Sequence, residues 1–540
     1  MPVKPAHRTR RWRVPARLAS ENGFTLMVAL GVMLVTSMLL AAAFAASRGD
    51  IQLSHRNTVQ KQAYYAALAG IQEYEFHLQA NPDYWETCDT PSKEVQGQKE
   101  VSGEEIDEHY EIKLLVASTA PSEFKECSTT SPFASMIQSS GIEANTFRIE
   151  SIGTAGNKAV SSSYATRTIV ATFHVIGFLN FIYFTQYEDG DPALYGGPKA
   201  CENYYPKRVS LKINNECATI EFANGDTVEG PMHTDDAADI CAPAYFGRKE
   251  HNPPDEVQIN NGTYSTCGNE NGTFYTATGK YEKGEELLTP EGDTTLGTYV
   301  KEGGDEFTGS THIVLNGSLN TMTVTNNKGE IKTYAWPTNG LVYVRASENE
   351  KTPCTYAYKD TTSETDNATE VSKETYCGNV YVSGTYSKSI TIAAEEDLII
   401  NGNIYPTSVK TLGEEPTGTD TLGLIAGHYV RVYHPVTSTN CEKAENGTES
   451  LKNPWIYAAI LSTNHSFAVD NYECGKQLGN LNVYGAIAQR FRGIVALVGE
   501  TGYIKNYKYD ERLAVDEPPY FLNPINAGWK VARETAPNPG

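Results

Sequence analysis

Residues 24–46 contain no charged side chain over 23 consecutive positions, and this run constrains the fold more than any other feature of the chain. A helix rises about 1.5 Å per residue, so a run of this length can cross a hydrocarbon layer of roughly 30 Å. The sequence therefore predicts one membrane-spanning helix near the N-terminus.

The leader before this run is strongly basic. Its charged residues are Lys4, Arg8, Arg10, Arg11, Arg13, Arg17 and Glu21. Lys and Arg are enriched on the cytoplasmic side of membrane helices, so we expect residues 1–23 to stay inside and the rest to cross.

The formal net charge of −22 argues against a nucleic-acid partner, because phosphate backbones need neutralising cations.

The helix is predicted to continue to about residue 80. From Arg48 to Gln79 there is no Pro, and small or apolar residues recur at intervals of three and four. These residues are Val59, Ala63, Ala66, Ala67, Gly70, Ile71, Tyr74 and Leu78. The spacing places them on one helical face, which would pack on a neighbouring domain. Asn81-Pro82 ends the pattern, because Pro disfavours helical geometry in the preceding residue.

The junction Gly23-Phe24-Thr25-Leu26 resembles the class III signal of type IV pilins and pseudopilins. The resemblance implies that prepilin peptidase cuts after Gly23 and that Phe24 is then N-methylated. It also implies that the apolar helix is kept, first as an anchor in membrane lipid and later packed among helices of other pilin-like subunits. The anchor residues would be Phe24, Leu26, Val28, Leu30, Val35, Leu39 and Phe44.

One position departs from the pilin pattern. Most pilins carry Glu at the fifth mature position, where this chain has Val28. A carboxylate at helix-centre depth costs roughly 2.5–3.5 kcal/mol on insertion scales. Pilins tolerate it because it pairs with the N-terminal ammonium of a neighbour, and Val28 cannot. The chain therefore resembles minor pilins of the PilX kind, whose N-termini are similar to residues 62–70, or the tip pseudopilin of type II secretion.

Two other interpretations of the N-terminus remain open. The helix could be an uncut signal anchor. It could also be a secretory signal cleaved at Ala43-Phe44-Ala45, although the apolar run is longer than the about 7–15 residues of such signals. The alternative function is then a secreted or membrane-anchored β-solenoid protein that binds or degrades carbohydrate.

All ten cysteines follow the apolar run. An even number on the translocated side predicts disulfides. The cysteines fall into five neighbouring pairs, which favours sequential pairing among many connectivities. The expected pairs are Cys88–Cys127, Cys201–Cys217, Cys241–Cys267, Cys354–Cys377 and Cys441–Cys474. None has C-x-x-C spacing, so a redox or zinc site is not expected.

Residues 83–180 are predicted to form a small β head on the helix. Alternation and β-branched residues predict strands at 110–116, 146–153 and 167–173. The pattern FRIxSxGxAG…RTIxATF in the last two resembles the strand pair that follows the helix in PilX-like proteins. In pilins this head is an antiparallel sheet on the exposed half of the long helix.

The remaining chain divides into an irregular region rich in Cys, Gly and Asn, residues 181–300, and a β-rich region, residues 301–540. Strands are predicted at 311–315, 340–345, 380–384, 389–392, 397–404, 422–426, 429–432, 456–461, 481–487 and 494–498. Short strands broken by Gly and Asn turns favour a β-solenoid over a sandwich, and both remain open. Residues 506–513 and 518–522 are predicted to cap its end.

No segment carries an enzyme motif such as G-x-S-x-G, H-E-x-x-H or a P-loop. His233 with Asp235 and Asp236 could form a metal or acid–base site, but a polar surface turn is the preferred interpretation. The best carboxylate cluster, Glu395-Glu396-Asp397, is interpreted as a solvated turn. We therefore predict no catalytic residue, no cofactor and no metal.

These features together predict an α+β protein with a long N-terminal helix, a small antiparallel head and a large disulfide-bonded β ectodomain. The expected function is that of a minor type IV pilin-like or pseudopilin-like structural subunit. It would sit in the bacterial cytoplasmic membrane as a single-pass protein and later display its ectodomain on a filament. Assembly priming or adhesion, to a surface or a glycan, is the expected task.

Overall fold

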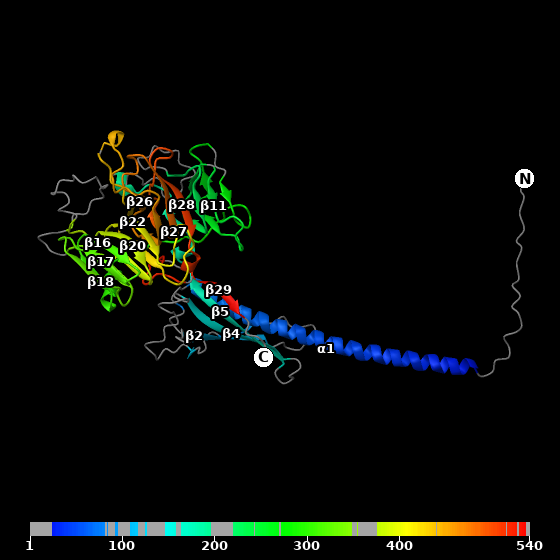
Figure 1. The fold of residues 1–540 in the computed structure, drawn as a ribbon. Coiled ribbons are helices and arrows are strands. Elements are labelled where there is room, and N and C mark those ends of the chain that lie inside the picture. Colours follow the sequence, from blue (N-terminus) through cyan, green and yellow to red (C-terminus); the bar gives the residue numbers. More distant parts are fainter. Residues whose placement is uncertain are drawn as a thin grey trace, which may run out of the picture.

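The computed structural model describes residues 24–80, 84, 92–95, 108–116, 125–126, 146–157, 164–195, 220–241, 243–268, 272–347, 354, 375–438, 440–514, 516–525 and 529–535. Three parts follow one another: a long helix, a small antiparallel sheet against its second half, and a large β-rich region (Figure 1). The first half of the helix projects away from the other two parts (Figure 1).

Helix α1 spans Phe24–Ala80, 57 residues without a break. Its segment Leu26–Phe44 is the one stretch in the described residues that is long and apolar enough to cross a membrane, and none of it is buried in the protein. By length and composition alone, such a segment is either a membrane anchor or a signal sequence. The end of α1 falls just before the predicted stop at Asn81-Pro82.

The small sheet has the strand order β1-β2-β4-β5-β29, and β3 also pairs with β2. These strands are β1 (Ser92–Val95), β2 (Glu108–Val116), β3 (Lys125–Glu126), β4 (Thr146–Gly156), β5 (Tyr164–Val175) and β29 (Trp529–Thr535). Every pairing is antiparallel. The three strands predicted for the head are confirmed as β2, β4 and β5, and β29 was not foreseen.

The helical stripe predicted from residue spacing packs against this sheet. All its members are buried: Val59, Ala63, Ala66, Ala67, Gly70, Ile71, Tyr74 and Leu78. The sheet contributes mainly aliphatic and aromatic side chains, among them Ile112, Leu114, Ile149, Phe147 and Phe173. The rings of Phe147 and Phe173 stack with centroids 5.1 Å apart. Removal of this apolar surface from water holds the second half of α1 to the sheet.

Strand β29 returns the chain to the small sheet after the β-rich region. It pairs with β5, placing Trp529 opposite Val175 and Thr535 opposite Val170. Because β5 ends at Val175 and β29 begins at Trp529, the β-rich region is an insertion between two neighbouring strands. Two chain segments rather than one therefore connect it to the small sheet.

The β-rich region consists mainly of short strands. Those before residue 300 are β6 (Tyr183–Tyr187), β7 (Glu221–Phe222), β8 (Thr227–Glu229), β9 (Met232–Thr234), β10 (Ala238–Ile240), β11 (Tyr245–Phe246), β12 (Val257–Ile259), β13 (Thr263–Tyr264) and β14 (Thr273–Phe274). A short helix, α2 (Leu296–Tyr299), follows. The later strands are β15 (Asp305–Thr308), β16 (Thr311–Asn316), β17 (Thr321–Thr325), β18 (Ile331–Ala335), β19 (Leu341–Arg345), β20 (Val380–Tyr386), β21 (Ile390–Ala394), β22 (Leu398–Pro406), β23 (Leu422–Ala426), β24 (Val430–Val432), β25 (Trp455–Ser462), β26 (Phe467–Val469), β27 (Gln477–Phe491) and β28 (Gly502–Tyr509).

Most of these strands pair in parallel. β19, β21, β23, β25 and β27 form successive parallel pairs, which align Ile392, Leu424 and Ile460 side by side. These three residues are fully buried in one shared core. β27 also pairs with β6, and β28 pairs with β8, so the last strands of the region contact its first strands. Parallel strands require crossover connections and are usually covered on both faces, which matches this burial.

The strand predicted at residues 494–498 is absent, and that prediction was wrong. The carbonyls of Ile494 and Val495 accept single hydrogen bonds from Val469 and Tyr503, which do not form a continuous ladder. Residues 506–509, predicted as part of a cap, lie in β28, which pairs with β27 and β8. Many strands before residue 300 have only two or three residues, too few for the alternation of a strand to be recognised.

Three of the five predicted disulfides are confirmed. Cys241–Cys267, Cys354–Cys377 and Cys441–Cys474 have Cα separations of 5.8, 4.6 and 4.5 Å. Cys88, Cys127, Cys201 and Cys217 lie outside the described residues. Disulfides persist in oxidising compartments, so the β-rich region belongs on the extracytoplasmic side.

Candidate assembly helix and its surroundings

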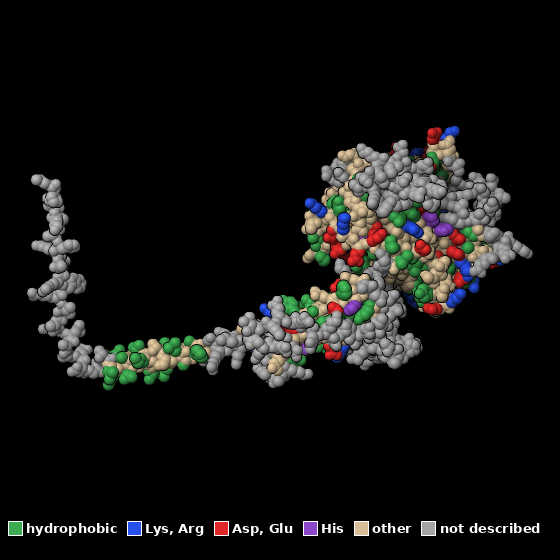
Figure 2. All heavy atoms as spheres, turned by 180° about the vertical axis from the view of Figure 1, so that it is seen from behind, with side chains coloured by type: hydrophobic (Ala, Val, Ile, Leu, Met, Phe, Trp, Pro, Cys, Tyr) green, Lys and Arg blue, Asp and Glu red, His purple; other side chains and the backbone are tan. Residues whose placement is uncertain are grey.

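The projecting half of α1 carries the predicted anchor residues. Their side chains are between 47% and 69% exposed: Leu26, Val28, Leu30, Val35, Leu39 and Phe44. Figure 2 shows hydrophobic side chains along the projecting rod. Phe24 begins the helix, but its side chain and the predicted processing residue Gly23 lie outside the described residues. An exposed apolar surface of this extent is unfavourable in water, and it is expected for a membrane anchor or a signal sequence.

Two small residues of β4 hold the second half of α1. The hydroxyl of Ser151 donates a hydrogen bond of 2.7 Å to the backbone carbonyl of Ala67. A Cβ at Gly153 would overlap the backbone of Ala63 and Ala67. The strand therefore approaches the helix more closely than a larger residue at position 153 would allow. Ser151 and Gly153 both occur in the FRIxSxGxAG pattern, but the pattern alone did not predict that they contact the helix.

The other face of the packed half of α1 carries aromatic side chains. Tyr64, Tyr65 and Phe76 are 38%, 64% and 64% exposed. These rings do not contribute to the core between α1 and the sheet. The helix therefore presents apolar side chains to its surroundings in both halves.

The residues around His233 are not a surface turn, so that interpretation was wrong. His233 lies in β9 and is 1% exposed. Its Nδ1 is 2.7 Å from Gln258 Oε1, and its Nε2 is 2.9 Å from Asp235 Oδ1. Burial raises the pKa of Asp235, and the hydrogen bond from His233 opposes this shift. Both ring nitrogens are engaged by the protein, which indicates a structural role.

The cluster Glu395-Glu396-Asp397 is also not a solvated turn. Asp397 is 1% exposed and accepts a hydrogen bond of 2.9 Å from Arg431. Burial raises the pKa of Glu396 to about 7, and the charge of Glu395 adds to the shift. Burial, with the same Glu395 charge, raises the pKa of nearby Asp293 to about 8. The chain thus buries several carboxyl groups close together where the sequence suggested exposed charges.

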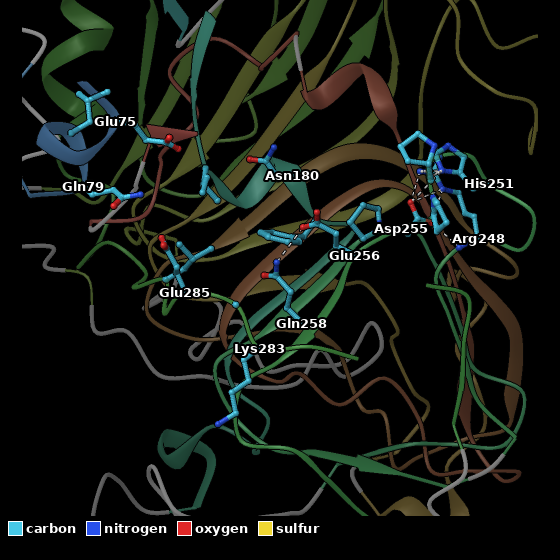
Figure 3. Close-up of a pocket in the computed structure, with 18 residues that line it drawn as sticks. Glu75, Gln79, Asn180, Arg248, His251, Asp255, Glu256, Gln258, Lys283 and Glu285 are labelled. Atoms are coloured by element: carbon cyan, nitrogen blue, oxygen red, sulfur yellow. Dashed lines mark hydrogen bonds and ion pairs between the residues drawn. The ribbon is translucent and has the colours of Figure 1, made fainter. Parts of the chain in front are cut away.

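A cavity of about 850 Å³ lies between the end of α1 and the β-rich region (Figure 3). Glu75 and Gln79 line it from α1. On the other side, the guanidinium group of Arg248 forms ion pairs with Asp255 at 2.6 Å and with Glu511 at 2.5 Å. These two ion pairs fix the position of the Arg248 side chain in the lining of the cavity.

Comparison with protein-family models, with curated proteins and with solved structures finds no match for this chain.

Proposed function

We propose that this chain is a minor type IV pilin-like or pseudopilin-like structural subunit. The observation that carries the proposal is the continuity of α1: its first half is apolar and free, and its second half is packed on an antiparallel sheet. A secretory signal has no need to continue directly into a packed helix. A subunit that inserts one helix into a helical bundle needs an apolar first half for the bundle and a second half that is packed on its own domain.

The N-terminal sequence supports the same proposal. Prepilin peptidase would cut between Gly23 and Phe24, leaving Phe24 as the first residue of α1. Before assembly, the segment Leu26–Phe44 would hold the chain in the bacterial cytoplasmic membrane, with the basic leader inside. During assembly the same segment would exchange lipid for the helices of other pilin-like subunits.

The β-rich region would be the displayed part of the subunit. We propose that its successive parallel ladders form a β-solenoid, which the alignment of Ile392, Leu424 and Ile460 supports. A domain of this size would clash with neighbours in a regular helical array. Together with Val28 in place of the usual Glu, this favours a minor position at a tip or protruding from a shaft, with assembly priming or adhesion as its task.

The first experiment determines the N-terminus of the membrane-extracted protein by mass spectrometry, in cells with and without prepilin peptidase. We expect a chain that begins at methylated Phe24 only when the peptidase is present. Gly23→Ala should block this processing. Gly31→Ala is the matched control, because a Cβ at Gly31 meets no other atom within 4 Å.

The outcomes separate the alternatives. A chain that begins at Met1 in both strains would indicate an uncut anchor, and one that begins near Ala46 would indicate a secreted protein. Either result would overturn the pilin-like assignment. Val28→Glu tests the assembly step, since a carboxylate at this depth should change the incorporation of the processed subunit into filaments. Unchanged incorporation would contradict the role given to Val28.

A further inference from the structure

Lys505 and Asp226 lie next to each other where the last strand of the β-rich region pairs with one of its first. Lys505 belongs to β28, and Asp226 directly precedes β8. The parallel register places Asn506 opposite Thr227, so the two side chains occupy the preceding positions of the same ladder. The pair is separated by 279 residues in the sequence.

The two groups are in direct contact and are shielded from water. Lys505 Nζ lies 2.6 Å from Asp226 Oδ2, and both residues are buried, with 8% and 4% exposure. The same carboxylate accepts a hydrogen bond of 2.9 Å from the backbone N–H of Ala223. The contact therefore holds an amine nitrogen against a fixed carboxyl group.

The surroundings of the pair are apolar on one side and charged on the other. Phe222 lies 6.0 Å from Lys505 Nζ, measured to the ring centroid, and Arg492 lies over the same ring at 3.7 Å. Arg492 in turn pairs with the fully buried Glu188 at 2.8 Å. Two cations and two carboxylates are thus enclosed together, and taking such ions out of water is unfavourable.

These surroundings shift Lys505 toward the uncharged amine. Burial lowers the pKa of Lys505, and the positive charge of Arg492 lowers it further, while Asp226 and Glu188 oppose the shift. A neutral lysine amine is a nucleophile. Removal of both charges of the Lys505–Asp226 pair would leave Arg492 and Glu188 as a balanced pair.

We propose that Lys505 and Asp226 condense to form an intramolecular amide bond. One proton first passes from the Lys505 ammonium group to Asp226 Oδ2, which leaves a neutral amine beside a neutral carboxyl group. Lys505 Nζ then attacks Asp226 Cγ, and a new Nζ–Cγ bond replaces the Cγ–Oδ2 bond. A second proton moves from Nζ to Oδ2, which leaves as water, and Oδ1 becomes the amide oxygen. No oxidant, metal or co-reactant is required. The water is lost from a buried site, where it does not remain to reverse the reaction.

This bond would join the beginning of the β-rich region to its end. The described disulfides close loops between residues only 23 to 33 positions apart. The amide would close a loop of 279 residues, for which the entropy lost by the unfolded chain is larger. β8 and β28 could then not separate under load, even when the disulfides are reduced. This inference does not depend on the pilin-like assignment.

The test is mass spectrometry on the full chain, extracted in detergent, reduced and alkylated. We expect an intact mass lower by one water than that of the Lys505→Arg variant after correction for the substitution. Trypsin, which does not cut after an acylated lysine, should release one branched peptide containing Asp226 and Lys505. The exposed pair Lys476–Glu445, with its atoms 2.8 Å apart, is the internal control and should yield separate peptides.

Two separate peptides, with unmodified Asp226 and cleavage after Lys505, would overturn the proposal. Loss of water without a branched peptide would also overturn it, because cyclisation within the backbone at an aspartate causes the same change in mass. Electrophoresis of the reduced, denatured chain is a second readout that does not depend on correct folding of the variant. The wild-type chain should migrate faster than Lys505→Arg, and equal migration would contradict the cross-link.

Discussion

The hydroxyl of Ser151 in β4 donates a hydrogen bond to the backbone carbonyl of Ala67, in the packed half of α1, over a distance of 2.7 Å. A helix carbonyl normally accepts from an N–H within its own helix, so this second donor comes from the sheet. Gly153, two residues further along β4, removes the side chain that would keep the two backbones apart. The position of the long helix on the sheet is therefore specified by polar contact and by close approach, in addition to apolar burial.

Substitution of Gly153 by Val should loosen α1 from the sheet. The new side chain would overlap the backbone of Ala63 and Ala67, and we expect a loss of at least about 2 kcal/mol in stability. Ser151→Ala should cost about 1 kcal/mol, because only one hydrogen bond is lost. Limited proteolysis of residues 48–80 in the detergent-extracted chain measures the release of the helix. Gly31→Ala is the control, and equal protection of all three variants would contradict this packing.

Replacement of Arg431 by Met should destabilise the β-rich region by about 3–5 kcal/mol, because two buried carboxylates lose their cation. Arg431 lies 2.9 Å from Asp397 and 2.7 Å from Asp470, and the three side chains are 6% exposed or less. Lys476→Met, which breaks the exposed pair with Glu445, should cost less than about 1 kcal/mol. Denaturant unfolding followed by tryptophan fluorescence compares the two. Similar midpoints would indicate that Arg431 is not buried between carboxylates.

The stability of the β-rich region should fall as the pH rises from about 5 to about 8. Burial raises the pKa of Asp293 to about 8 and that of Glu396 to about 7. Glu395 and Tyr343 also interact with Asp293. The folded state therefore binds more protons than the unfolded state in this interval, and stability is lost as these carboxyl groups ionise. Asp293→Asn should flatten the dependence of the melting temperature on pH. Glu500 is exposed, so the control substitution Glu500→Gln should leave the dependence of the melting temperature on pH unchanged. If Asp293→Asn also left it unchanged, the raised pKa of Asp293 would be refuted.

Removal of the disulfide between Cys441 and Cys474, by changing both residues to Ser, should cost about 3 kcal/mol, because the bond closes a loop with a sequence separation of 33 residues. Thermal unfolding of the variant should occur at a lower temperature than that of the wild type under oxidising conditions. Under reducing conditions the difference should disappear. A difference that persists after complete reduction would show that the serines, rather than the lost bond, are responsible.

The elements that the sequence predicted well depend on local or periodic patterns. The stripe from Val59 to Leu78 was recognised because helical spacing repeats over several turns, and every member is buried. The strands β2, β4 and β5 were recognised from alternation. The strand predicted at residues 494–498 was wrong because its apolar residues satisfy only isolated hydrogen bonds. β29 was missed because its partner β5 is more than 350 residues earlier in the chain.

The sequence by itself determined that residues 24–46 form an apolar helix, that this helix continues with one face suited for packing, and that three neighbouring pairs of cysteines form disulfides. Each of these properties depends on residues close together in the chain. Only the tertiary structure decided that the β-rich region is inserted between β5 and β29, that His233 and Asp397 are buried, and that Lys505 meets Asp226. Each of these features depends on residues that are far apart in the sequence. Folding brings them together through hydrogen bonds between backbone strands, and such bonds require no particular side-chain pattern within either segment.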